Sequence, residues 1–177
     1  MKKLVFYTML ASMVILHSCD TPNTDEILQE EAVLKSGKKV LNFRAHLSGD
    51  QEVPPNESAA QGEAIFQLSK DGTELSYKLI VANLEDVSAS HIHIAPAGSN
   101  GNVVAFLYPS SPPSVLIPGT TNGVLAEGVI TAANLRGPLL NQPLSALISA
   151  MQEGNAYVNA HTTLFPGGEI RGQIFGN

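Results

Sequence analysis

The stretch Ser90–Gly101, with the sequence SHIHIAPAGSNG, combines a strand pattern with a turn pattern. Its first half has the period of a β-strand, because His91 and His93 alternate with Ile92 and Ile94. Successive side chains of a strand point to opposite faces, so the two imidazoles share one face, about 7 Å apart along the strand. The second half, rich in proline, glycine and asparagine, is typical of a turn.

A second informative stretch lies much further along the chain. Tyr157–Thr163 (YVNAHTT) also has the period of a strand, and it is followed by Pro166–Gln173 (PGGEIRGQ). By parity, Tyr157, Asn159 and His161 lie on the same face of this strand. Two strands joined by a Pro-Gly-Gly turn are therefore expected near the end of the chain.

Strand patterns dominate the rest of the chain. The strand that carries His91 is expected to start after a link at Asn83–Val87, and Lys70–Thr73 (KDGT) predicts a hairpin turn. Only Leu144–Met151 has helical period, with Gly154 placed to end that helix. These patterns predict an all-β fold, an antiparallel β-sandwich or barrel of about eight short strands, immunoglobulin-like or superoxide-dismutase-like, with one short helix late in the chain. The other expected strands lie at 41–47, 64–68, 75–81, 103–107, 123–131, 156–164 and 168–175.

Composition narrows the possible partners and metal sites. The net charge is −6, and removal of Lys2 and Lys3 with an N-terminal signal takes it to −8, which argues against nucleic-acid binding. The chain has one cysteine, Cys19, so it cannot form an intramolecular disulfide. Cysteine-based zinc sites and blue-copper sites are excluded as well, because both need thiolate ligands.

The N-terminus has the pattern of a bacterial lipoprotein signal. A basic start and a short apolar stretch lead to Leu16-His17-Ser18-Cys19, which resembles a lipobox. Residues 1–18 are therefore expected to be a signal peptide and Cys19 the lipidated residue. Acyl chains on Cys19 would anchor the chain stably to a membrane.

The remaining chain divides into a tether and a domain. Residues 19–39 are polar and acidic at first and predict a lipidated tether, and residues 40–177 predict one domain. The expected location is the bacterial cell envelope, with the protein lipid-anchored at the outer membrane or the cell surface.

Four ordered motifs together resemble the CHRD (chordin) domain over about residues 41–175. They are an opening LSGDQEVPP at 47–55, the His91-Ile92-His93 strand, the Asn100-Gly101 turn and the closing block over Tyr157–Gln173. The resemblance implies a β-sandwich-like extracellular module in a bacterial lipoprotein. It gives a fold and a location more than a defined activity.

Three histidines form the candidate metal site: His91, His93 and His161. A His-x-His pair on one strand face, completed by a third imidazole from another strand, can bind one copper or zinc ion. The arrangement is similar to the copper half of copper/zinc superoxide dismutase, but His46 alone cannot supply the zinc half. The alternative is a polar network in which the imidazole N–H groups bind carbonyls of the turn at Asn100.

Other polar residues are expected to support this site or the fold. Glu169 and Arg171 share a face and could form an ion pair that locks the last strand. They could equally stabilise the loop after His161 or support a ligand histidine. Tyr157 and Asn159 could line the same surface. Glu52, in the opening motif, is expected to anchor a buried loop, with a ligand-binding carboxylate as the alternative.

The function favoured by the sequence is a membrane-anchored binding or interaction module. No catalytic residues are expected, because no nucleophile elbow or phosphate-binding loop is present in the sequence. Its partners would be the membrane, through Cys19, and an unidentified extracytoplasmic protein or glycan. The alternative function is a single-metal protein, redox-active or metal-scavenging, that uses the three histidines.

Overall fold

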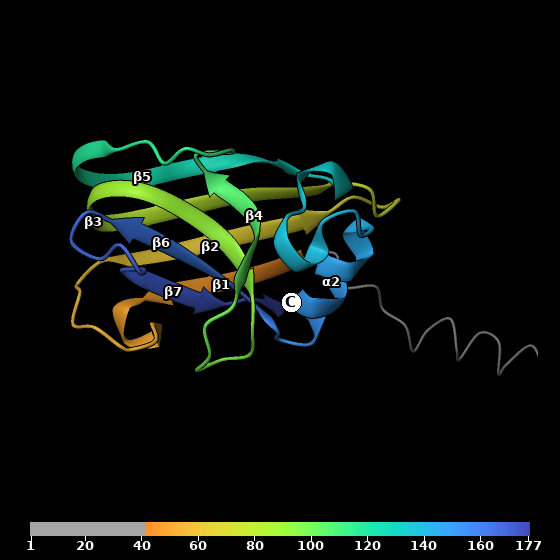
Figure 1. The fold of residues 1–177 in the computed structure, drawn as a ribbon, viewed down its shortest axis with the longest axis horizontal. Coiled ribbons are helices and arrows are strands. Elements are labelled where there is room, and N and C mark those ends of the chain that lie inside the picture. Colours follow the sequence, from red (N-terminus) through yellow and green to blue (C-terminus); the bar gives the residue numbers. More distant parts are fainter. Residues whose placement is uncertain (1–41) are drawn as a thin grey trace, which may run out of the picture. The chain divides into compact units, whose positions relative to one another are not determined.

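Alternating apolar and polar residues give the first two strands one buried face each. Every second side chain is buried in β1 (Asn42–Ser48) and in β2 (Gln61–Leu68), and the two strands pair antiparallel. The computed structural model describes residues 42–177, which form the barrel in Figure 1. The predicted signal peptide, the lipidation at Cys19 and the tether lie outside the described residues.

The long strand β3 (Leu75–Ile94) contacts most of the others. Its first part pairs with β2 along one edge and with β5 (Ile117–Ile130) along the other. Its last part pairs with β6 (Ala156–Thr162) and β4 (Asn102–Tyr108). The strand therefore joins two parts of the sheet and carries His91 and His93 at its end.

The prediction of a link at Asn83–Val87 between two separate strands is wrong. The chain stays in one strand, which bends where Asn83 and Asp86 take positive φ angles of 57° and 49°. Asparagine and aspartate tolerate this conformation better than most residues. The pairing of β3 with β5 shifts register between Val81 and Leu84 and between Glu85 and Val87, the intervals that contain these two residues, so bulges absorb them while the ladder continues.

The strands close into an antiparallel barrel. The sheet order is β2-β1-β7-β6-β3-β4, with β7 at Ile170–Gln173, and β2 also pairs with β3, which closes the ring. β5 adds to β3 outside this ring, and the short β8 (Phe175–Gly176) pairs with β1. The all-β antiparallel fold predicted from the sequence is confirmed, and the barrel is the form it takes.

The helix α2 (Leu144–Gln152) lies at one end of the barrel (Figure 1). It buries Leu144, Leu147, Ile148 and Met151, the four residues that gave the helical period, and Gly154 follows it with a φ of 69°. No helix within residues 42–177 is long and apolar enough to cross a membrane. Three short 3-10 helices complete the described chain, at Gly49–Gln51 (η1), Ala132–Asn134 (η2) and Gly137–Leu139 (η3).

One wall of the barrel is buried on both faces. On β6, Ala156, Val158 and Ala160 join the apolar core, whereas Tyr157 and Asn159 are buried on the opposite, outer face. Loops cover this outer face and supply polar partners to it. The wall therefore holds a second, polar layer outside the apolar core, and the candidate site lies in that layer.

Candidate metal centre

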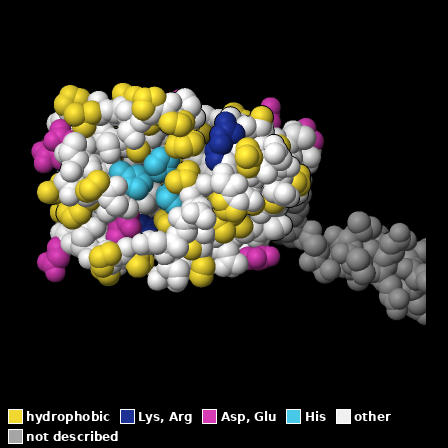
Figure 2. Space-filling model, viewed as in Figure 1, with side chains coloured by type: hydrophobic (Ala, Val, Ile, Leu, Met, Phe, Trp, Pro, Cys, Tyr) yellow, Lys and Arg dark blue, Asp and Glu magenta, His cyan; other side chains and the backbone are white. Residues whose placement is uncertain are grey.

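Strand register brings the three histidines together. In the pairing of β3 with β6, His91 lies opposite Asn159 and Ala89 lies opposite His161, so His161 is a diagonal neighbour of His91. One ring nitrogen from each of His91, His93 and His161 lies within 4.8 Å of the others. Figure 2 shows histidine side chains gathered in one patch on this face of the molecule.

Backbone carbonyls determine which ring nitrogens are free. His93 Nδ1 lies 2.9 Å from the Gly101 carbonyl oxygen, and His161 Nδ1 lies 3.0 Å from that of Pro166. Because a carbonyl oxygen only accepts, each Nδ1 carries the hydrogen and each Nε2 keeps a lone pair. The Nε2 of His161 then accepts a 3.1 Å hydrogen bond from His91 Nδ1, which an ion between the rings would replace. Ligand histidines commonly donate their second N–H to a carbonyl in this way.

The geometry needs a rotation of the imidazoles to hold an ion. Zinc–nitrogen bonds of about 2.1 Å at tetrahedral angles place two ligand nitrogens about 3.4 Å apart. His91 Nδ1 and His161 Nε2, at 3.1 Å, are already near this separation, whereas the outer limit of 4.8 Å in the cluster exceeds it by about 1.4 Å, which side-chain rotation must supply. In addition, His93 Nε2 is buried and finds no hydrogen-bond partner among the described residues.

The environment keeps the imidazoles neutral, which is the form that binds a metal. Burial lowers the pKa of His91 to about 3, and His161 and His93 add to that shift. Burial also lowers the pKa of His161, although its bond to the Pro166 carbonyl opposes the shift. For His93 burial is again the largest cause of a lowered pKa; Gly101 and Asn159 oppose it, and the Arg171 cation adds to it.

A stack of side chains positions His93. The Tyr157 ring lies parallel to the His93 ring, with 4.8 Å between centroids, and the Arg171 guanidinium lies 3.5 Å from the Tyr157 centroid. Arg171 also donates to the carbonyl oxygens of Pro96 and Ser99, and Tyr157 Oη accepts from the Gly101 amide. Arg171 and Tyr157 therefore hold the loop whose carbonyl orients His93.

Glu169 stabilises the loop after His161. No ion pair joins it to Arg171 within the described chain, so the ion-pair expectation does not hold. Its two carboxylate oxygens instead accept 2.6 Å hydrogen bonds from the hydroxyls of Ser58 and Thr162. The reason is that β7 begins at Ile170, so Glu169 precedes the strand and turns toward the neighbouring loops.

Glu52 is a buried carboxyl group beside this layer. It is 5% exposed, and its Oε1 has no hydrogen-bond partner in the part of the chain that the structure describes. Burial raises the pKa of Glu52 to about 7, against the opposing effect of Arg171. A Cβ at Gly168 would collide with Glu52 Oε1, so the Glu52 carboxyl group packs closely against the backbone at Gly168.

Several contacts of the site were not predicted. The Pro166 carbonyl, which orients His161, and Phe106, whose ring lies edge-on to His91 at 5.0 Å, carry no distinctive sequence signal. The Gly101 carbonyl was predicted only in general terms, because the polar-network alternative placed an imidazole N–H at the Asn100 turn. That contact is present, and it is equally what orients His93 toward a metal.

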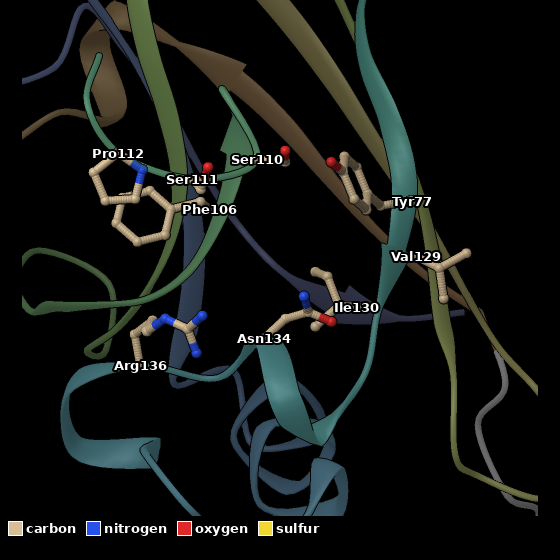
Figure 3. Close-up of a pocket in the computed structure, with 9 residues that line it drawn as sticks. All are labelled: Tyr77, Phe106, Ser110, Ser111, Pro112, Val129, Ile130, Asn134 and Arg136. Atoms are coloured by element: carbon tan, nitrogen blue, oxygen red, sulfur yellow. The ribbon is translucent and has the colours of Figure 1, made fainter.

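Phe106 also lines a separate small cavity. It has a volume of about 50 Å³, and Figure 3 shows Tyr77, Ser110 and Arg136 among the side chains around it. Tyr77 Oη donates to the Leu107 carbonyl, and Arg136 donates to the carbonyls of Ala133 and Leu135. These polar groups are already engaged within the protein, so the cavity is not a second candidate site.

Comparison with known proteins identifies the family. The family model of the CHRD domain matches residues 43–174, and the chain therefore belongs to the CHRD domain family. The match spans the barrel from β1 to the residue after β7 and includes all three histidines. No curated protein and no solved structure matched the chain. Membership of this family supports a binding or interaction module in general terms.

Proposed function

We propose that this protein is a lipid-anchored, extracytoplasmic CHRD domain that binds a single zinc or copper ion through His91, His93 and His161. One observation carries the metal proposal. Three imidazoles from two strands converge, and backbone carbonyls occupy the Nδ1 atoms of His93 and His161, which leaves their Nε2 lone pairs for an ion.

The donor set favours zinc or copper over harder ions. Neutral imidazole suits these two metals, whereas magnesium and calcium take oxygen ligands. The cluster has no acidic or thiol member among the described residues. Three protein nitrogens leave at least one coordination position for a further ligand, as in sites that exchange water or substrate.

The proposed location comes from the N-terminal sequence. The basic start, the apolar stretch within residues 1–18 and the single cysteine at position 19 support export and lipidation. An anchored chain would display the barrel outside the cytoplasm, at the outer membrane or the cell surface.

Zinc and copper titration of the full-length chain in detergent tests the metal proposal. We expect one equivalent of metal to bind the wild-type chain, and His93→Ala to weaken binding at least tenfold. His46→Ala is the matched control, because His46 is an exposed histidine on β1 that lies beside Glu63 and outside the cluster. Equal metal affinity of His93→Ala and wild type would refute the proposal.

A second candidate function is recognition of an envelope glycan or protein by the loops. Two cavities of about 370 and 380 Å³ adjoin Glu52, and loop residues such as Pro55, Gly98 and Phe165 line them. Thermal-shift screening against envelope glycans tests this function. The expected result is a ligand that stabilises His93→Ala as much as wild type, whereas a ligand that needs His93 would point to the metal site instead.

A further inference from the structure

Asn159 occupies the one strand position that adjoins all three histidines. It lies directly opposite His91 in the pairing of β3 with β6, and it precedes His161 by two residues on the same face. The third histidine, His93, is its diagonal neighbour across the strands. Asn159 is 3% exposed, so its amide must find partners inside the protein.

The amide oxygen of Asn159 lacks such a partner. Neither Asn159 Oδ1 nor His93 Nε2 makes a hydrogen bond within residues 42–177, although both atoms are buried. Asn159 and His93 are diagonal neighbours in the pairing of β3 with β6, so the two unpartnered atoms belong to side chains on one buried face. The lone pair of His93 Nε2 and the carbonyl oxygen of Asn159 are both acceptors. Only a species that satisfies two acceptors at once stabilises this pair of atoms.

The other end of the amide faces Glu52. A Cβ placed on Gly168 would lie 3.0 Å from Asn159 Nδ2 and would collide with Glu52 Oε1, so these two atoms surround the same point. An amide N–H donates and a carboxyl oxygen accepts, whether or not the acid is ionised. Glu52 therefore favours the orientation in which Nδ2 points toward the loop and Oδ1 points toward the histidines.

We propose that Asn159 Oδ1 is the fourth protein ligand of the metal ion, with Glu52 fixing the orientation of its amide. This inference rests on the proposed function. It completes a four-coordinate site of three nitrogens and one neutral oxygen, and it accounts for the two unsatisfied acceptors at once. Asn159 lies on the buried side of the cluster, so His91 and His161 remain at the edge that solvent reaches.

The competing arrangement is an amide rotated by 180°. In that orientation Nδ2 would donate to His93 Nε2 and Asn159 would be a structural residue that competes with the metal. The two arrangements differ in what an aspartate would do. A carboxylate at position 159 is a stronger ligand than an amide, but it cannot donate to an imidazole lone pair.

The test compares Asn159→Asp and Asn159→Ala by Zn²⁺ competition titration of the full-length chain, with Co²⁺ visible spectra as a second readout. A ligand role predicts that Asn159→Asp binds Zn²⁺ at least as tightly as wild type. It also predicts that Asn159→Ala binds about tenfold or more weakly, with a changed Co²⁺ spectrum. Wild-type affinity and spectrum in Asn159→Ala would overturn it, as would Asn159→Asp weakened as much as Asn159→Ala.

Controls keep this test separate from the test of the metal site itself. If the wild-type chain binds neither zinc nor copper, the proposed function fails. If wild type binds and His93→Ala does not, but the Asn159 variants behave like wild type, only the fourth ligand is refuted. Thermal melting identifies a variant that does not fold; should Asn159→Ala be one, the affinity ratio of Asn159→Asp to wild type decides.

Discussion

Replacement of Glu52 by glutamine changes how the stability of the barrel depends on pH. Burial raises the pKa of this carboxyl group from 4.5 to about 7. A group whose pKa is raised in the folded state contributes stability below its unfolded pKa, and that contribution is lost as pH rises through the folded pKa. Wild type therefore loses stability between about pH 4.5 and 7, and the uncharged glutamine does not.

The size of the effect follows from the pKa difference. A change from 4.5 to about 7 corresponds to at most about 3 kcal/mol at 1.36 kcal/mol per unit. Glu52 is 5% exposed but adjoins two cavities, and water in them screens the charge, so we expect about 1–2 kcal/mol. The free energy of unfolding of Glu52→Gln, relative to wild type, should rise by this amount from pH 5 to pH 8.

Urea denaturation at several pH values, with a chelator present, measures this difference. The histidines titrate equally in both proteins, so their effect cancels in the comparison. Glu57→Gln is the matched control, since Glu57 lies on the exposed side of the same loop. A pH-independent difference between Glu52→Gln and wild type, or a variant less stable at pH 8 than at pH 5 relative to wild type, would refute the reasoning.

Three further predictions concern the loops and the metal. Gly168→Ala should lower the free energy of unfolding by about 1–3 kcal/mol in urea denaturation, because its φ is 132° and a Cβ would collide with Glu52; Gly167→Ala, where a Cβ meets nothing, should be near neutral. Arg171→Lys should cost about 3 kcal/mol in the same assay, because an ammonium cannot reproduce the fork that binds Pro96 and Ser99 or the stack on Tyr157. Zinc at a hundredfold excess over its Kd should stabilise wild type by about 2.7 kcal/mol in thermal unfolding, and a chelator or His93→Ala should abolish that gain.

The sequence predicted β1 and β2 well because one face of each of these strands is apolar. β1, β2 and α2 bury the residues that their periodicity indicated. The long β3 was predicted as two strands, since Asn83 and Asp86 look like loop residues. They are instead accommodated as left-handed residues within a bent strand, which is a consequence of pairing on both edges that local sequence does not reveal.

For the candidate site, the sequence predicted only which residues share a face of the same strand. Parity places His91 and His93 on one face and groups Tyr157, Asn159 and His161 on another strand, but it says nothing of register. The contact between His91 and His161 depends on the pairing of Ala89 with His161, which is a tertiary fact. The carbonyl of Pro166 could not be predicted, because any residue carries a carbonyl group and only the loop path brings this one to His161.

The fold provides the candidate metal site because it buries polar residues on the outer face of one barrel wall. Arg171 is 1% exposed, yet its guanidinium is satisfied by loop carbonyls and the Tyr157 ring, so its burial needs no counter-ion. Asn159, His93 and Glu52 have buried atoms that the described residues leave unsatisfied, although they belong to the same layer. A layer that satisfies its arginine through ordered loops but leaves both Asn159 Oδ1 and His93 Nε2 unpaired supports the proposed cation site over a purely structural network.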